Sequence, residues 1–213
     1  MARTIGLRVL QLRGEVADVA TQVNSAVALC EEHEFVHYLA MALILRGWAK
    51  AQKGDFEKGV ADIQQGREML RSNGAMLYES YTLALLAETC IKNEHYREAL
   101  DYLEQAQARL NDENCERFYA AEIYRLLGEA HLRLGNERDQ AESWIQKGLQ
   151  LAAEQKSRSL ELKLRLSMYE LHEPGQNADE YRSYLKETYS GFSEGFETAD
   201  LMNARAKLDV RSC

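Results

Sequence analysis

The chain has 213 residues, of which 46% are hydrophobic and 28% charged, so it is long enough to bury a substantial core. Its formal net charge of −8 disfavours a nucleic-acid partner, and no apolar run reaches the roughly 18 residues that a membrane span needs. One proline, four scattered cysteines and the lack of a signal-peptide pattern predict a helical, cytoplasmic protein with reduced thiols.

Residues 1–34 predict a partial helical hairpin. Leu7 falls at the small-residue position of a short first helix, and a second helix is expected from Glu15 to about Glu32. Its inward stripe is Val16, Val19, Val23, Ala26, Val27 and Cys30. Because a repeat array normally begins with a polar capping unit, we expect either a piece of a longer polypeptide or a shortened first hairpin.

His33, Glu34 and His37 form a literal His-Glu-x-x-His pattern, which holds zinc when both histidines project from one continuous helix. The repeat described below places Glu34 at the position of Gly74, in a turn between two hairpins. The extended zinc-protease pattern is absent as well. We therefore reject both histidines as metal ligands and expect no metal, cofactor or catalytic residue; a zinc hydrolase is kept as an alternative.

Residues 36–74 predict a complete hairpin, with its inner turn at Gly54 and its end at Gly74. Glycine in an exposed helix costs about 1 kcal/mol relative to alanine, so Gly59 and Gly66 are expected on the face where two helices cross closely.

The next hairpin, residues 83–110, shows the repeat most clearly. Small residues alternate with large ones on two stripes, in the spacing of a tetratricopeptide repeat: Leu83, Leu86, Ala87 and Cys90, then Tyr96, Ala99, Leu103 and Ala106. The same spacing recurs about every 40 residues, at Gly59, Ala99 and Ala141. The recurrence predicts stacked hairpins with helices about a turn longer than in the commonest form.

The last part of the chain is less regular. Leu162, Leu164 and Leu166 occupy more than one helical face, which predicts burial from several sides, and Tyr181 replaces a small residue, which predicts a wider crossing. Thr198 is a plausible N-cap for a final helix that covers the end of the array. We expect one domain: a partial hairpin (1–34), full repeats (35–74, 75–112, 113–156), a degenerate repeat (157–192), and a capping helix and tail (193–213).

Four stretches resemble the C-terminal tetratricopeptide region of large bacterial signalling proteins. They are Leu43–Ala49, Tyr124–Ala130, Ser159–Leu162 and Glu194–Leu201, the last being the most specific. In that family a nucleotide cyclase or DNA-binding domain precedes an ATPase, which the repeats follow. The resemblance covers nearly the whole chain and implies a regulatory interaction array. It implies no catalysis here, and the sequence contains no Walker A phosphate-binding loop.

Together these observations predict an all-α fold, a right-handed α-α superhelix with a C-terminal capping helix, whose function is to bind a protein or peptide in its concave groove. The candidate groove residues are Trp48, Tyr81, Glu88, Lys92, Glu122, Arg125, Glu129 and Arg133. The expected partners are such a ligand and neighbouring domains of a longer chain. The alternative is a self-association module that forms a homodimer through the open N-terminal face.

Overall fold

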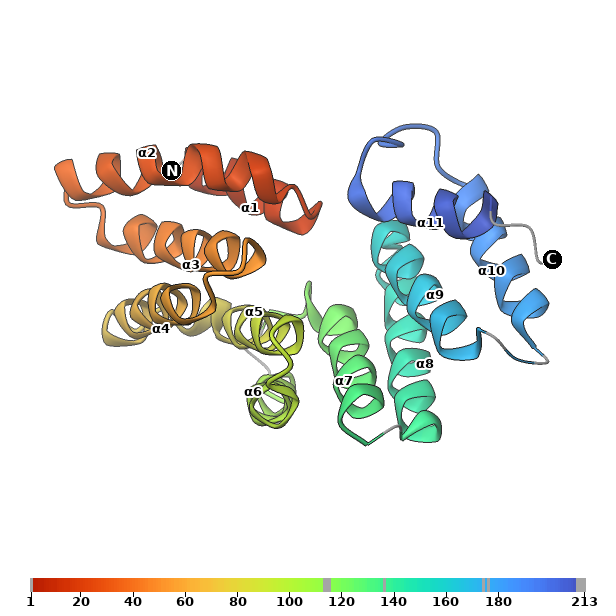
Figure 1. The fold of residues 1–213 in the computed structure, drawn as a ribbon. Coiled ribbons are helices and arrows are strands. Elements are labelled where there is room, and N and C mark those ends of the chain that lie inside the picture. Colours follow the sequence, from red (N-terminus) through yellow and green to blue (C-terminus); the bar gives the residue numbers. More distant parts are fainter. Residues whose placement is uncertain (1, 113–115, 136, 174, 176, 210–213) are drawn as a thin grey trace. The chain divides into compact units, whose positions relative to one another are not determined.

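The computed structural model describes residues 2–112, 116–135, 137–173, 175 and 177–209. Within these ranges the chain forms eleven α-helices and one short 3-10 helix, with no strand (Figure 1). Successive helices pack against each other as antiparallel pairs, so the predicted all-α fold class is confirmed. The chain divides into two compact units, unit 1 (Met1–Arg117) and unit 2 (Phe118–Cys213), which are described separately.

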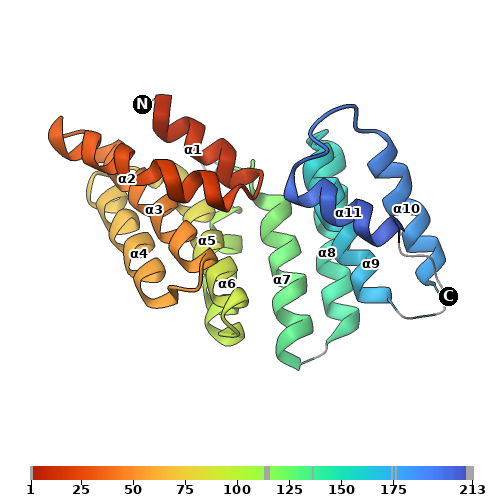
Figure 2. The same cartoon turned by 45° about the horizontal axis from the view of Figure 1, so that its top comes forward.

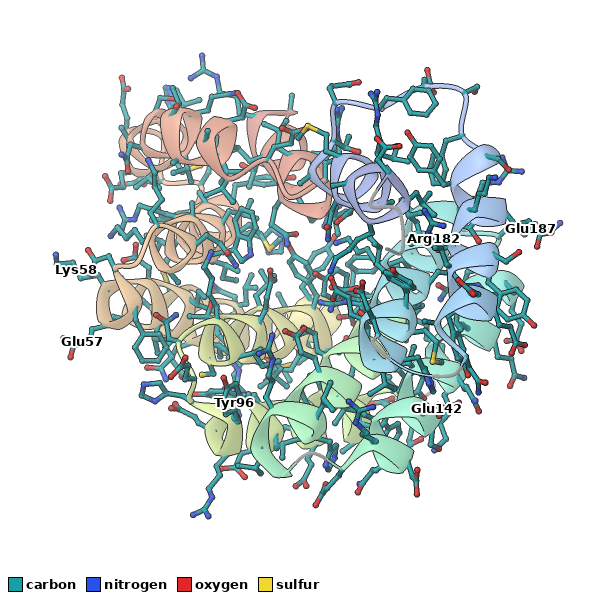
Figure 3. All side chains as sticks on the ribbon, turned by 45° about the vertical axis from the view of Figure 1, so that its right-hand side comes forward. Glu57, Lys58, Tyr96, Glu142, Arg182 and Glu187 are labelled. Atoms are coloured by element: carbon teal, nitrogen blue, oxygen red, sulfur yellow. The ribbon has the colours of Figure 1, made fainter. Side chains whose placement is uncertain are left out.

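Unit 1 is a run of helices that pair in chain order (Figure 2). They are α1 (Ala2–Leu12), α2 (Val16–Glu32), α3 (Val36–Gln52), α4 (Phe56–Ser72), the 3-10 turn η1 (Met76–Tyr78), α5 (Glu79–Lys92) and α6 (Tyr96–Arg109). The helices α3 and α5 are buried on most sides, whereas α6 buries a single stripe formed by Ala99, Leu103 and Ala106. Figure 3 shows Glu57 and Lys58 projecting from α4 into solvent.

Left-handed residues end most helices of unit 1 at a fixed interval. Gly14, Glu34, Gly54, Gly74 and Glu94 all have positive φ and lie twenty residues apart. In each turn the following amide donates to a carbonyl five residues earlier, at 2.9 to 3.0 Å, which satisfies a carbonyl at the helix end. The turn expected at Glu34 is therefore confirmed, and it separates His33 at the end of α2 from His37 in α3.

The predicted glycine crossing is present between α3 and α4. A Cβ atom added at Gly59 would lie 2.7 Å from the Ala51 Cβ and 2.8 Å from the Gly47 carbonyl oxygen, and one at Gly66 would lie 2.5 Å from the Ala40 carbonyl oxygen. Both glycines are buried. Backbone therefore meets backbone at this crossing, and no larger residue fits without displacing a helix.

Unit 2 is built around a helix that belongs to two cores. Its helices are α7 (Ala120–Gly135), α8 (Arg138–Glu154), α9 (Arg158–His172), α10 (Ala178–Ser190) and α11 (Ala199–Asp209). On α9, Leu164, Met168 and Leu171 pack with residues of α7 and α8, while Leu162, Leu166 and Tyr169 pack with Leu185 of α10 and Leu201 and Ala204 of α11. The expected burial of this helix from several sides is confirmed.

Thr198 and Tyr181, the residues named in the other expectations for the last helices, both make side-chain contacts within unit 2. Thr198 directly precedes α11, and its hydroxyl donates to the Gly195 carbonyl at 2.8 Å. Tyr181 stacks on His172 with ring centroids 3.9 Å apart, so an aromatic pair fills the α9–α10 crossing. Cys30 and Cys90 are free and buried. Cys115, Cys213, Pro174 and Gln176 lie outside the described residues.

Replacing Glu94 by glycine should raise the stability of the chain by about 0.5 to 1 kcal/mol. Its φ of 65° costs a residue with a side chain about 1–2 kcal/mol, which exceeds the entropy that glycine loses on folding. Denaturant unfolding measures the change. Glu104→Gly, at an exposed position inside α6, should instead lower stability by about 1 kcal/mol, and a loss in both variants would contradict the turn assignment.

Gly59→Ala should destabilise the chain by about 1–3 kcal/mol, because the methyl group has no room between α3 and α4. Gly6 is the matched control, since it lies inside α1 and nothing lies within 4 Å of an added Cβ. Gly6→Ala should raise stability by up to about 1 kcal/mol. Thermal unfolding of both variants distinguishes packing from helix propensity, and equal changes would rule out a tight crossing.

Candidate functional site

Side-chain hydrogen bonds join α3 to α5. They connect three of the candidate groove residues, Trp48, Glu88 and Lys92, through one further residue, Gln52. The Trp48 indole N–H donates to Glu88 Oε2 at 3.1 Å, and the Gln52 side-chain amide donates to Glu88 Oε1 at 3.1 Å. Lys92 Nζ donates to Gln52 Oε1 at 2.8 Å. The Trp48–Glu88 and Gln52–Lys92 pairs are each separated by 40 residues, so the repeat interval brings equivalent positions together.

The apolar candidates Trp48 and Tyr81 offer almost no surface. Trp48 is 2% exposed and Tyr81 is fully buried. The reason is that α1 lies against this face, since the Tyr81 hydroxyl donates to Gln11 Oε1 of α1 at 2.7 Å. Around Trp48 and Tyr81, the surface predicted to be an open groove is therefore filled by another helix of unit 1. The candidate groove residues that face solvent lie near the C-terminal end of α5, where Lys92 is exposed and Glu88 is half-buried.

In unit 2 the candidate Glu122 is a buried carboxylate at the centre of an ion-pair network. It is 2% exposed and lies 2.9 Å from the guanidinium of Arg125, in a two-pronged contact, and 3.9 Å from Lys163 Nζ of α9. Arg125 also reaches Glu129 at 3.0 Å, and Lys163 reaches Asp200 of α11 at 3.7 Å. One network thus links α7, α9 and α11.

The two carboxylates of this network have opposite pKa shifts. Burial favours the neutral form of Glu122, but the charges of Arg125 and Lys163 outweigh it and lower the pKa from 4.5 to about 2. Burial dominates at Asp200, so its pKa is raised despite Lys163, and the nearby charge of Glu122 raises it further. Glu122 therefore remains ionised in mild acid, while Asp200 accepts a proton more readily than a free aspartate.

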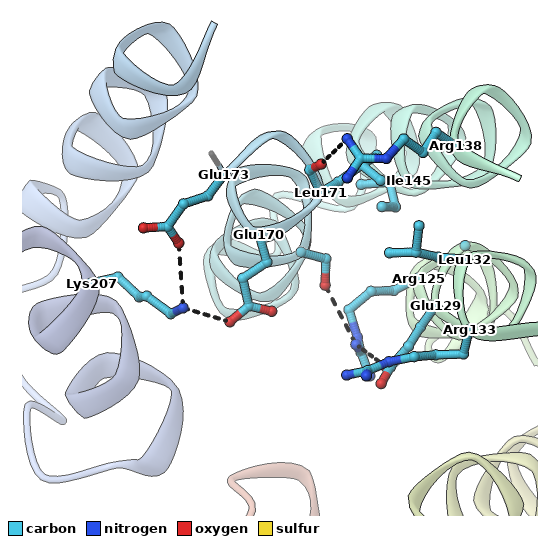
Figure 4. A pocket seen from close by; sticks show the side chains of 12 residues that line it. Arg125, Glu129, Leu132, Arg133, Arg138, Ile145, Glu170, Leu171, Glu173 and Lys207 are labelled. Atoms are coloured by element: carbon cyan, nitrogen blue, oxygen red, sulfur yellow. Dashed lines mark hydrogen bonds and ion pairs between the residues drawn. The ribbon is translucent and has the colours of Figure 1, made fainter. Parts of the chain in front are cut away.

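Beside this network lies a pocket with a volume of about 700 Å³, formed by α7, α8, α9 and α11 of unit 2 (Figure 4). Leu132, Ile145 and Leu171 supply its apolar lining. On the α9 side, Lys207 of α11 lies 3.6 Å from both Glu170 and Glu173. The other charged lining residues are Arg125, Glu129, Arg133 and Arg138. The pocket is large enough for a small molecule or a peptide segment.

The polar candidates of α7 come together at this pocket, but the sequence did not reveal most of its wall. Glu129 and Arg133 line it with Arg125, whereas Glu122 is buried behind. Sequence reasoning missed Ser167, Glu170 and Lys207 of the pocket lining, which come from α9 and α11. A repeat-interval search could have found one of them, because Ser167 is 42 residues from Arg125 and lies 3.5 Å from its guanidinium.

The two histidines of the zinc-like pattern do not share a helix. His33 stacks on Phe35 at the end of α2, and His37 contacts Tyr38 within α3 and lines a pocket of about 150 Å³ with Arg8 and Tyr78. Within the described ranges, no three side chains of histidine, cysteine, aspartate or glutamate gather as metal ligands would. None of the helices in that part of the chain has the length and apolarity of a membrane span.

Comparison with known proteins shows a distant similarity. A stretch of 152 residues is 24% identical to an uncharacterized protein of Rhizobium meliloti, and this stretch covers 71% of the present chain but 15% of that protein. The chain is thus similar to a small part of a much longer protein. No protein-family model matches it.

Glu122→Gln should destabilise the chain by roughly 3 kcal/mol at pH 7, because Arg125 and Lys163 lose their shared buried carboxylate. The folded pKa of Glu122 lies below its unfolded value of 4.5, so its stabilisation is complete above that value and disappears as pH falls through about 2. The gap between wild type and variant should therefore close in acid. Denaturant unfolding at a series of pH values measures it.

The raised pKa of Asp200 acts in the opposite direction, since protonation in mild acid relieves a cost rather than removing a gain. Because the charge of Glu122 itself raises the pKa of Asp200, the comparison of Glu122 with glutamine is also made in an Asp200→Asn background, where Asp200 no longer titrates. Glu187→Gln, on the exposed side of α10, is the surface control. A gap that stays constant from neutral pH to pH 2 would contradict the role assigned to Glu122.

Proposed function

We propose that this chain is a non-catalytic protein- or peptide-binding repeat array that serves as the regulatory or sensor region of a larger bacterial signalling protein. In the proposed parent, an ATPase is coupled to a nucleotide cyclase or a transcription activator. Two observations support the assignment: the resemblance carried most specifically by Glu194–Leu201, and the match to only 15% of a longer Rhizobium protein.

The observation that carries the binding role is the arrangement of consecutive helix pairs whose first helices end in polar side chains. In unit 1 the last turn of α5 presents Lys92 to solvent beside the half-buried Glu88 and Gln52. These groups are held in place by hydrogen bonds to each other, so they form a pre-organised polar surface. Pre-organised surfaces lose little side-chain entropy on binding a partner.

Self-association is a second candidate, and the surface of α1 favours it. Ile5 is 46% exposed and Val9 is 50% exposed, one helical turn apart on the same face. Apolar residues so placed suit contact with another copy of the chain. Light scattering over a dilution series tests this candidate, and a monomer at every concentration would remove it.

The groove assignment is tested by exchanging one exposed cation. The immobilised chain should capture a specific protein from extracts of the source cells. Lys92→Glu should weaken this capture at least severalfold, because it reverses a charge on the surface formed by Gln52, Glu88 and Lys92, the α3–α5 surface. The matched control is Lys58→Glu, since Lys58 is also exposed but lies on α4 and points away into solvent. Captured amounts are compared by quantitative mass spectrometry.

Equal capture by the wild type and both variants would show that the α3–α5 surface is not the binding face. Substitutions at the candidate groove residues Trp48 and Arg125 are unsuitable for this test. Trp48 is buried in the core, and Arg125 is paired with a buried carboxylate, so changes there would disturb folding rather than a surface.

A further inference from the structure

Two of the four cations that line the pocket of unit 2 form no ion pair with a carboxylate of the described residues. Four of its lining residues are cationic and three are carboxylates. Lys207 is paired with Glu170 and Glu173, and Arg125 with Glu129 and the buried Glu122.

Arg133 and Arg138 are the remaining cations of the lining, and within the described ranges neither forms an ion pair. Arg138 donates one hydrogen bond, to the Leu171 carbonyl at 3.1 Å, which leaves most of its donors unused. Both residues are exposed, and they come from the last turn of α7 and the first turn of α8. Guanidinium groups in this state are suited to receive carboxylates in charge-assisted hydrogen bonds.

An apolar surface lies between these two cations. Figure 4 shows Leu132 between Arg133 and Arg138, with Ile145 beside it. Ile145 is 2% exposed and forms part of the core floor. A ligand that fits this lining carries acidic groups on both sides of an apolar side chain.

The exposure of the residues in the pocket walls favours a peptide ligand over a small molecule. Sites for small molecules bury most of the ligand surface. Here Arg133, Arg138, Glu170 and Glu173 are all exposed, so a compact ligand would remain largely in solvent. A chain segment can lie across such a surface and continue beyond it on either side.

We propose that the unit 2 pocket binds an acidic peptide segment of a partner protein, in which carboxylates that flank an apolar residue are received by Arg133 and Arg138. This inference rests on the proposed binding function and specifies the chemistry of the ligand. It assigns Arg125 a supporting position, because its guanidinium is already occupied by Glu122 and Glu129.

The test uses the whole chain and a short fluorescein-labelled peptide that carries glutamates on both sides of a leucine pair. Fluorescence anisotropy should show saturable binding that weakens with added salt. Arg133→Gln and Arg138→Gln should each raise the Kd roughly tenfold, the effect of losing one hydrogen bond between charged groups. Lys186→Gln removes an exposed cation of α10 outside the pocket lining and should leave the Kd unchanged.

Two further comparisons decide the chemistry. A peptide with glutamines in place of the glutamates should bind at least tenfold more weakly, and free glutarate should compete only at far higher concentration than the peptide. Equal binding of both peptides would overturn the role of the carboxylates, and glutarate competing as well as the peptide would overturn the choice of a peptide.

A loss of folding in one variant would not prevent a decision about the site. The Arg133 side chain makes no hydrogen bond or ion pair within the described ranges, so Arg133→Gln should keep the wild-type melting curve even if Arg138→Gln does not. An unchanged Kd in a folded Arg133→Gln variant would refute the site. Absence of peptide binding would refute it too, while leaving the comparison of Lys92→Glu with Lys58→Glu as a separate test of the binding array.

Discussion

The recurrence of a left-handed residue every twenty positions is the constraint on which unit 1 depends. Each such residue ends one helix and lets the chain reverse, so that all long helices have similar lengths and every second helix is shifted by about forty residues. The hydrogen bonds of Trp48 with Glu88 and of Lys92 with Gln52 follow directly from that interval. Glycine occupies three of these positions, and glutamate at 34 and 94 adopts the same backbone against its own preference.

Sequence reasoning succeeded where the local pattern alone determines the structure. The helices, the crossing at Gly59 and Gly66, the break at Glu34 and the double burial of α9 all follow from spacing and residue size. It failed where the outcome depends on a distant helix. Trp48 and Tyr81 lie on the stripe that was expected to face a ligand, but burial of that stripe by α1 depends on a contact seventy residues apart, which no periodicity encodes.

The charged groups of unit 2 fall into two sets, those paired with each other in the interior and those left exposed to solvent. Glu122, Arg125 and Lys163 satisfy each other in the interior, so their charges hold α7 and α9 together rather than facing solvent. A buried ion pair of this kind contributes less to stability than its geometry suggests, although removing one partner is costly. Only the cations left outside such pairs can contribute strongly to binding. Sequence alone could not separate the two groups, because Arg125 and Arg133 occupy similar positions on one helix.

The shared position of α9 has a consequence for how unit 2 comes apart. One side of this helix belongs to the α7–α8 core and the other to the α10–α11 core. If α10 and α11 detached, Leu162, Leu166 and Tyr169 would face water, and α9 would lose half of its apolar surroundings. The helices of a repeat array usually melt stepwise from the ends. A helix common to two cores works against that gradual fraying and favours cooperative unfolding of the whole unit.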